Sequence, residues 1–194
     1  MNNPSEESQL AALVLAGSRE AYSQLYEKTI TEVYRTVRFL VGESSDTDDV
    51  VQEIYIQAYR SLGQYDAARP FRPWLMGVVM RQIRAYRRKR WNHIRLIKKA
   101  QQSGSVADHD FSGEVADRLS YRPLIASVER LPYKLKQVVI LHYLNEYSQD
   151  EIADALGIPL GTVKSRIHAA LRKLRSKRSS EILLRGKVED LHEA

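Results

Sequence analysis

Between positions 161 and 175, side chains that can bind nucleic acid recur on one side of a predicted helix. At 100° per residue, apolar residues fall on one side of this helix, and hydrogen-bond donors and cations fall on the other. The candidate contacts are Lys164, Ser165, Arg166, His168 and Arg172. Such donors read base edges in the major groove and hold phosphates, and no acidic residue between Ala155 and Ser180 repels a polyanion. The pattern indicates DNA binding, although an ordinary amphipathic helix with a solvated basic face shares it.

A second basic helix, predicted from Phe71 to Arg90, combines an aromatic residue with arginines. Leu75, Val79 and Ile83 share one face of it. The opposite face carries the candidates Trp74, Arg81, Arg84 and Arg88. A tryptophan in line with arginines suits stacking on unpaired bases while the guanidinium groups hold the nucleic-acid backbone. The alternative is that Trp74 belongs to the core and the arginines are solvated.

The helix predicted over residues 46–62 has an outer face of a different kind. Its outer residues are Asp49, Gln52, Glu53, Ile56 and Arg60. An isoleucine among charged residues on an outer face favours a protein-contact surface. Asp46 and Asp48 could suggest a metal site, but the glycine and ligand spacing of a calcium loop are absent. Capping and the helix macrodipole explain these acids better.

Other chemistry is not visible in the sequence. The absence of cysteine excludes disulfides, thiol nucleophiles and cysteine-ligated zinc, and the five histidines do not pair at metal-ligand spacing. With no glycine-rich phosphate loop either, we expect no metal, no cofactor and no enzymatic activity. The net charge of +6 allows a polyanionic partner without requiring one. No apolar run could span a membrane and the chain does not start with a signal peptide, so we expect a cytoplasmic protein.

The elements that position these residues are predicted to be helices. An amphipathic stretch runs from about Ser5 to Leu15. The next helix starts at the N-cap Ser18 and stops at Gly42, and Asp46 is expected to cap the third. Residues 63–70 are predicted to form a loop before the helix over 71–90.

The second half of the chain predicts four more helices, over 121–130, 133–144, 148–156 and 161–177. Ser148 and Glu151 form a capping-box pattern, Gly157 ends that helix, and Thr162 is placed to cap the next. A short helix, a tight turn and a second helix make a helix-turn-helix. The stretch from about residue 100 to residue 120 lacks periodicity and is typical of a linker. The fold class is therefore all-α, with two small helical domains joined by a flexible linker.

The order of these segments resembles the extracytoplasmic-function (ECF) sigma factors of the sigma-70 family. Asp-Asp-Val-Val-Gln-Glu-Ile-Tyr (48–55) followed by Phe-Arg-Pro-Trp-Leu (71–75) is similar to region two of that family. Residues 131–144 and 148–153 look like region four, and Gly-Ile-Pro-Leu-Gly-Thr-Val-Lys-Ser-Arg-Ile-His (157–168) is the most specific stretch. The resemblance covers about residues 19–175.

The resemblance implies a sigma factor that binds core RNA polymerase and directs promoter-specific transcription initiation. Residues 1–95 would form the region-two domain, with the polymerase docked on the outer face of helix 46–62 and the minus-ten element captured and melted by loop 63–70 and the following helix. Residues 96–120 would be the linker, residues 121–178 would read the minus-thirty-five element, and residues 179–194 would be a tail. An anti-sigma factor, often membrane-anchored, would hold the protein inactive until a stress or envelope signal.

Two other classes of protein fit part of the sequence. A stand-alone helix-turn-helix regulator explains residues 121–177 equally well, but it leaves the aromatic-basic helix and the outer face of helix 46–62 unexplained. A nuclease or deaminase would need histidines and carboxylates grouped for metal or acid–base chemistry, and the sequence does not group them.

Overall fold

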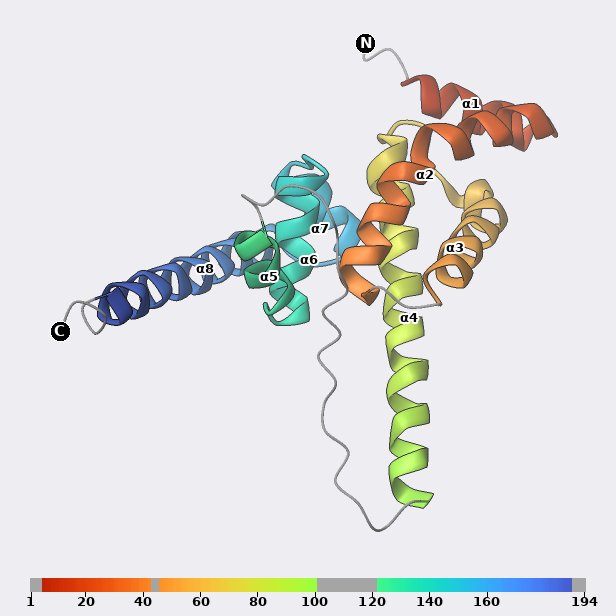
Figure 1. The fold of residues 1–194 in the computed structure, drawn as a ribbon. Helices are drawn as coiled ribbons and strands as arrows, with labels where there is room; N and C mark the ends of the chain where they lie inside the picture. Colours follow the sequence, from red (N-terminus) through yellow and green to blue (C-terminus); the bar gives the residue numbers. More distant parts are fainter. Residues whose placement is uncertain (1–4, 43–45, 101–121, 190–194) are drawn as a thin grey trace.

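The structure, a computed structural model, describes residues 5–42, 46–100 and 122–189, and for residues 96–100, 122–123 and 177–189 it gives the helical backbone alone. Within these ranges the chain is helical, without strands, as predicted (Figure 1). The N-terminal unit contains α1 (Glu6–Leu15), α2 (Arg19–Val41), α3 (Thr47–Ser61), the short η1 (Leu62–Gln64) and α4 (Phe71–Ala100). The C-terminal unit contains α5 (Arg122–Glu129), α6 (Tyr133–Val139), the π-helical η2 (Ile140–Leu144), α7 (Gln149–Leu156) and α8 (Leu160–Glu189).

The N-terminal unit is built around α4. At the start of α2, Ser18 Oγ accepts a hydrogen bond from the Ala21 N–H at 3.1 Å, and Gly42, with a φ of 93°, ends the helix. Both predicted helix ends are thereby confirmed. The predicted inner face of α3, from Val51 to Ala58, is buried as well. Residues 75–80 of α4 are all buried, because α4 is covered by α2 and α3 and also by the C-terminal unit.

The C-terminal unit contains the predicted helix-turn-helix. Ser148 and Glu151 form the capping box at the start of α7, and Gly157 adopts the left-handed conformation, with a φ of 63°, at its end. On α8 the predicted inner residues Val163, Ile167 and Ala170 are buried. These apolar side chains fix the orientation of α8, so its polar side faces outward.

Two predicted caps are wrong. Helix α8 begins at Leu160, and Thr162 lies inside the first turn, where its N–H donates to the Pro159 carbonyl at 2.8 Å. The Pro159 carbonyl accepts from the N–H groups of both Thr162 and Val163, the latter at 3.2 Å, so the first helical turn is already closed from Leu160 onward. Asp46 precedes α3 but makes no side-chain capping bond; its carboxylate accepts a hydrogen bond from the Tyr86 hydroxyl of α4 at 2.6 Å. A long-range partner has replaced the local one.

Two helices are longer than predicted. Helix α4 continues to Ala100, past the expected domain end at residue 95, and α8 continues to Glu189, into the segment expected to be a tail. The apolar periodicity of α4 ends near Tyr86, but no glycine or proline follows it in the helix to stop it. The rest of the expected linker, residues 101–120, and the tail end, residues 190–194, lie outside the described residues.

The two units pack against each other. Helices α2 and α4 lie between α3 on one side and the C-terminal unit on the other (Figure 1). Helix α7 makes the most extensive contact, with α4, and buried residues of both units form one continuous apolar cluster. None of the helices in the described ranges is long and apolar enough to cross a membrane.

Candidate nucleic-acid and protein interfaces

The outer face of α8 presents the side chains predicted to contact DNA. Lys164, Ser165, His168 and Arg172 are exposed, and Arg166 is half-buried at the edge. The Ser165 hydroxyl donates to the Thr162 carbonyl at 3.0 Å, which leaves its oxygen free to accept from a base edge. The structure therefore brings four of these residues together on an open surface at the N-terminal half of the helix. This is the part of a recognition helix that reaches base edges.

The predicted DNA face of α4 is only partly open. Arg81, Arg84 and Arg88 are exposed on it. Gly77 lies on the same face but is buried, because α7 covers it: a Cβ placed on Gly77 would lie 3.4 Å from the Ala155 carbonyl oxygen. The arginines therefore form a basic strip that starts at the edge of the contact between the two units.

The surroundings of Trp74 fit parts of both roles predicted for it, stacking on a base and packing in the core. Its ring is half-buried, with its centroid 5.2 Å from that of Tyr65 and 5.4 Å from that of Phe71. Tyr65 and Phe71 also meet edge to face at 5.4 Å. The three rings join the loop after α3 to the first turn of α4, so Trp74 packs within an aromatic cluster and still keeps part of its surface exposed.

The loop before α4 is fixed by residues that sequence reasoning did not single out. The Tyr65 hydroxyl donates to the Arg69 carbonyl at 2.5 Å and also hydrogen-bonds the hydroxyl of Ser8, a buried residue of α1, at 2.8 Å. Arg69 Nη1 lies 3.6 Å from an Asp154 carboxylate oxygen on α7. The loop is thus attached to α1 on one side and to the C-terminal unit on the other. The one sequence signal for this role was that Tyr65 is the single aromatic residue among residues 63–70.

The residues predicted for protein contact on α3 divide between two grooves. Asp49, Gln52, Glu53, Ile56 and Arg60 are all exposed. Gln52, Ile56 and Arg60 border a groove of about 990 Å³ between α2 and α3. Asp49 and Glu53 border a separate groove of about 830 Å³ between α3 and α4, opposite Lys89 and Arg90. One helix therefore supplies two chemically different surfaces.

Tyrosines dominate the groove between α2 and α3. Tyr26 and Tyr59 are largely exposed there, and Tyr22 packs edge to face on Tyr59 with ring centroids 5.2 Å apart. The Tyr22 hydroxyl donates to the Tyr55 carbonyl at 2.8 Å. Burial, followed by the neighbouring tyrosines, raises the pKa of Tyr22 to about 12. The hydroxyl of Tyr22 therefore stays protonated, and the groove offers aromatic surface of the kind that carries binding energy in protein interfaces.

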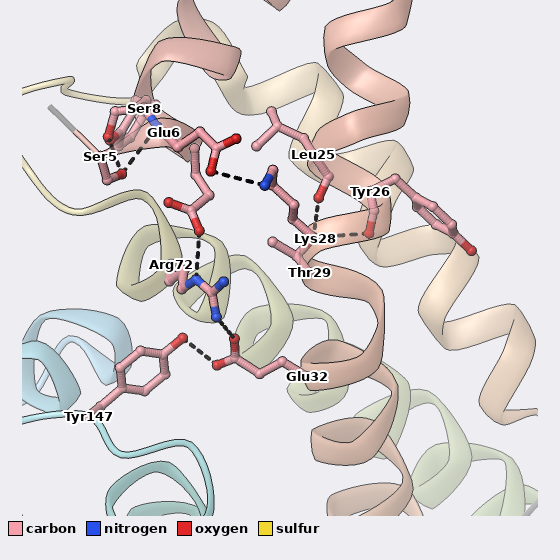
Figure 2. A network of polar contacts seen from close by, with 12 residues as sticks. Ser5, Glu6, Ser8, Leu25, Tyr26, Lys28, Thr29, Glu32, Arg72 and Tyr147 are labelled. Carbon is pink, nitrogen blue, oxygen red and sulfur yellow. Dashed lines mark hydrogen bonds and ion pairs between the residues drawn. The ribbon is translucent and has the colours of Figure 1, made fainter.

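A cluster centred on Glu32 joins α1, α2, α4 and the C-terminal unit (Figure 2). Arg72 of α4 pairs with Glu7 of α1 at 2.9 Å and with Glu32 of α2 at 3.3 Å. The hydroxyl of Tyr147, a buried residue of the C-terminal unit, donates to the other oxygen of Glu32 at 2.5 Å. Burial, followed by the charge of Glu32, raises the pKa of Tyr147, so its hydroxyl stays protonated. We call Glu7, Glu32, Arg72 and Tyr147 the Glu32 cluster.

Further polar contacts join the two units beside the Glu32 cluster. Asn145 Nδ2 donates to the Thr36 hydroxyl at 2.9 Å, and Arg35 donates to the Leu144 carbonyl at 3.0 Å. On the α4 side, the Arg87 guanidinium lies 4.2 Å from the centroid of the Tyr133 ring, a cation–π contact. The closed arrangement of the two units is therefore held by apolar packing and by specific polar pairs.

Comparison with known proteins identifies both units. Residues 25–93 match the family model described as Sigma-70 region 2, and residues 121–174 match the model described as Sigma-70, region 4. The chain is 28% identical over 173 residues to the ECF RNA polymerase sigma factor SigW of Bacillus subtilis, covering 84% of this chain and 91% of that one. It is 32% identical over 155 residues to the ECF sigma factor SigL of Mycobacterium tuberculosis, covering 78% of this chain and 85% of that one.

Solved structures share the fold. CnrH, determined in complex with the cytosolic domain of CnrY, is 24% identical and superposes with a TM-score of 0.66, covering 90% of this chain and 97% of that one. The sigma factor RpoE of Bartonella quintana, determined in complex with the anti-sigma factor NepR, is 19% identical and superposes with a TM-score of 0.65, covering 80% and 94%. Together with the two family models and the relatives, this places the chain among the ECF RNA polymerase sigma factors of the sigma-70 family.

Proposed function

We propose that this sigma factor binds core RNA polymerase and directs it to promoters that carry two separate elements. The observation that carries the proposal is the presence of two DNA-type surfaces on different units, the outer face of α8 and the basic strip of α4. Two modest binding surfaces on one chain gain apparent affinity when a third partner fixes their spacing. Core polymerase is the partner expected to do this for a sigma factor.

The outer face of α3 is the proposed polymerase contact. Gln52, Ile56 and Arg60 line the tyrosine-rich groove with α2, where an apolar or aromatic part of the polymerase can be buried. Asp49 and Glu53, on the next groove, are placed to pair with basic side chains at the edge of that interface. An aromatic centre with charged edges is the usual anatomy of a specific protein interface.

The two DNA surfaces have different proposed roles. Lys164, Ser165 and His168 of α8 read the minus-thirty-five element as duplex DNA, while Arg166 and Arg172 hold its phosphates. Arg81, Arg84 and Arg88 of α4 hold the backbone of the minus-ten element, and the exposed part of Trp74 stacks on an unpaired base. The aromatic cluster around Trp74 supports this role because it holds the ring beside the loop that precedes α4, through Tyr65 of that loop. All these roles are binding roles, and none requires a reaction.

An anti-sigma factor is the proposed regulatory partner. The structure of RpoE, which has a similar fold, was determined with an anti-sigma factor bound. This chain presents an exposed tyrosine-rich groove on the surface that polymerase would need. A protein that fills this groove would block the polymerase while leaving the sigma factor folded.

In-vitro transcription from a randomised promoter library tests the proposed function. Purified core polymerase is used with and without the full chain, and with the variant Lys164→Ala. We expect transcripts that depend on the protein and share two upstream elements, and we expect Lys164→Ala to relax the preference at the distal element alone. The proposal fails if no transcript depends on the protein while the chain binds duplex DNA tightly without polymerase, as a stand-alone regulator would.

A further inference from the structure

Helix α1 lies before residues 25–93, the part of the chain that the Sigma-70 region 2 model matches. Its inner side is nevertheless part of the core of the N-terminal unit, because Leu10, Ala11 and Val14 are buried. Glu6 also pairs with Lys28 of α2 at 3.0 Å (Figure 2). Helix α1 is therefore attached to α2, and the polar residues of its first turns have defined positions.

A chain of hydrogen bonds runs from the start of α1 to the loop before α4. The Tyr65 hydroxyl has one proton, which it donates to the Arg69 carbonyl at 2.5 Å. The Ser8 hydroxyl, 2.8 Å from the Tyr65 oxygen, is therefore the donor in that contact. Ser5 Oγ lies 3.0 Å from Ser8 Oγ and donates to it, and it also accepts from the Ser8 N–H as the cap of α1. The donors thus run in one direction, from the cap of α1 to the loop.

The Ser8 hydroxyl is enclosed by the protein. Ser8 is only 4% exposed, so its hydroxyl cannot exchange Tyr65 freely for water. Buried hydroxyl groups are usually hydrogen-bonded, and the partner that Ser8 has outside its own helix is Tyr65. The bond between Ser8 and Tyr65 therefore restricts where the Tyr65 ring can lie.

The loop before α4, residues 65–70, depends on the Tyr65 ring for its position. At its tip, the Asp66 carboxylate accepts from the Ala68 N–H at 2.9 Å, and the Asp66 carbonyl accepts from the Arg69 N–H at 2.9 Å, which closes a tight turn. Tyr65 joins this turn to Trp74, because its hydroxyl bonds Arg69 while its ring packs 5.2 Å from the Trp74 ring. A shift of the Tyr65 ring would therefore move the turn relative to Trp74.

Helix α1 also holds the other end of this loop. The Glu7 carboxylate accepts from Arg72 Nε at 2.9 Å, and Arg72 lies in the first turn of α4, two residues before Trp74. Ser8 and Glu7, neighbours on one helix, thus hold the two ends of the loop. A segment fixed at both ends needs less ordering when a strand binds to it, and such preorganisation favours binding.

We propose that α1 presets the loop of residues 65–70 for capture of the minus-ten strand, with Ser8 as a positioning residue that acts through Tyr65. The inference rests on the proposed role of this loop and Trp74 in capturing that strand. It adds to promoter opening a helix that belongs to neither of the proposed DNA surfaces.

A double-mutant cycle in the full chain tests whether Ser8 acts through Tyr65. The variants are Ser8→Ala, Tyr65→Phe and the two combined, and the readout is permanganate reactivity of minus-ten thymines in open complexes with core polymerase. Ser61→Ala is the matched control, because the Ser61 hydroxyl bonds the Gln57 carbonyl within α3 and does not reach the loop. Binding to core polymerase and far-UV circular dichroism are measured for every variant.

We expect Ser8→Ala to lower the reactivity about threefold or more, the effect of one lost hydrogen bond on the population of preset loops. The combined variant should be no worse than Tyr65→Phe alone, because the two residues act through one bond. Ser61→Ala should match the wild type, and all variants should bind core polymerase equally. Unchanged reactivity in Ser8→Ala would overturn the proposal. So would effects of Ser8→Ala and Tyr65→Phe that multiply in the combined variant, as two independent structural defects would.

Fluorescence quenching tests the support of the loop without any DNA. The chain has two tryptophans, and Trp91 is 68% exposed, so Trp91→Phe leaves Trp74 as the sole reporter with little effect on packing. In this background Ser8→Ala should increase quenching of Trp74 by acrylamide, because the Tyr65 ring that covers it is held less firmly. Ser61→Ala should leave quenching unchanged. Equal quenching in all three proteins would overturn the support of the loop by α1.

The two measurements, with Trp74→Ala added to the permanganate assay, separate the inference from the proposed function. If Trp74→Ala abolishes opening while Ser8→Ala does not change it, the role of Ser8 is wrong and the role of Trp74 stands. If Ser8→Ala increases quenching while neither Ser8→Ala nor Trp74→Ala changes opening, α1 does support the loop, and the proposed role of the loop and Trp74 in strand capture is wrong.

Discussion

Tyr147→Phe is the substitution that most directly perturbs the contact between the two units. It removes the hydroxyl that donates to Glu32 at 2.5 Å and keeps the buried ring. The carboxylate of Glu32 is not left unpaired, because Arg72 still holds it at 3.3 Å. The backbone carbonyl of Tyr147, which interacts with the His142 ring at 2.8 Å, is also unchanged. The C-terminal unit should therefore stay folded while its attachment to α2 weakens.

The size of the effect follows from the chemistry of the lost bond. A hydrogen bond to a charged group contributes about 1.5–3 kcal/mol, and the lower end applies here because the acceptor keeps a second partner. A loss of about 1.5 kcal/mol shifts the ratio of closed to open molecules about tenfold. Glu32→Ala should cost more, since it leaves both the Tyr147 hydroxyl and Arg72 without that partner.

Fluorescence energy transfer between the two units measures the shift. Dyes are attached to cysteines introduced at Glu27 and Lys173, two exposed positions on α2 and α8, in a chain that has no other cysteine. We expect Tyr147→Phe to lower the population with high transfer, with the far-UV circular dichroism of the wild type. Tyr143→Phe, at an exposed tyrosine nearby, is the control. The reasoning is refuted if transfer falls equally in both variants or stays unchanged in Tyr147→Phe.

Three further predictions address the other surfaces. Tyr65→Phe keeps the ring contacts and removes the bonds to Ser8 and Arg69, so unfolding in urea should become easier by only about 1 kcal/mol, while permanganate reactivity of minus-ten thymines in the open complex should fall several-fold. Unchanged reactivity would mean that the loop does not position the melted strand. Ile56→Glu should weaken binding to core polymerase about tenfold or more in a competition assay, whereas Leu13→Glu, at an exposed leucine of α1, should not. Burial alone raises the pKa of Glu7, but hydrogen bonds from its own backbone and from Arg72, with the Arg72 charge, lower it overall. The stability from this pair is complete above the pKa of unfolded glutamate, about 4.3, and is lost as pH falls through the lower folded value, so Glu7→Gln should flatten the acid side of the stability profile in urea titrations.

Local sequence patterns predicted the helices well because their causes are local. The 3.6-residue periodicity of α3 and α8 identified the buried faces, since each helix has one apolar side. Ser18, Gly42 and Ser148 marked helix ends because their side chains or backbone angles act within a few residues. The prediction that the Asp46 side chain caps α3 was wrong for the opposite reason. The partner of Asp46, Tyr86, lies forty residues away and becomes available only when α3 packs on α4.

Sequence patterns predicted which helix faces carry the candidate sites, but they did not predict how these faces lie relative to one another. Lys164 to Arg172 form the surface expected from helical angles. The five α3 residues looked like one surface, but the packing of α2 and α4 on either side assigns them to two grooves. Trp74 stayed ambiguous because its surroundings come from Tyr65, in a loop whose path no periodicity describes. The contact of α7 with α4 depends on pairs such as Tyr147 and Glu32, more than a hundred residues apart, which no local pattern contains.

Gly77 also helps to predict which members of the family can pack their two units together in this way. A glycine inside a helix costs about 0.5–1 kcal/mol relative to alanine, so the chain carries an intrinsic weakness in the second turn of its central helix, α4. An alanine there would still fit against the Ala155 carbonyl, whereas a branched or aromatic residue would hold the two units apart. The residue at this one position therefore predicts whether a relative can form the same contact. Relatives with glycine or alanine there can pack α7 on α4 in this way, whereas in relatives with a bulky residue α7 cannot approach α4 this closely.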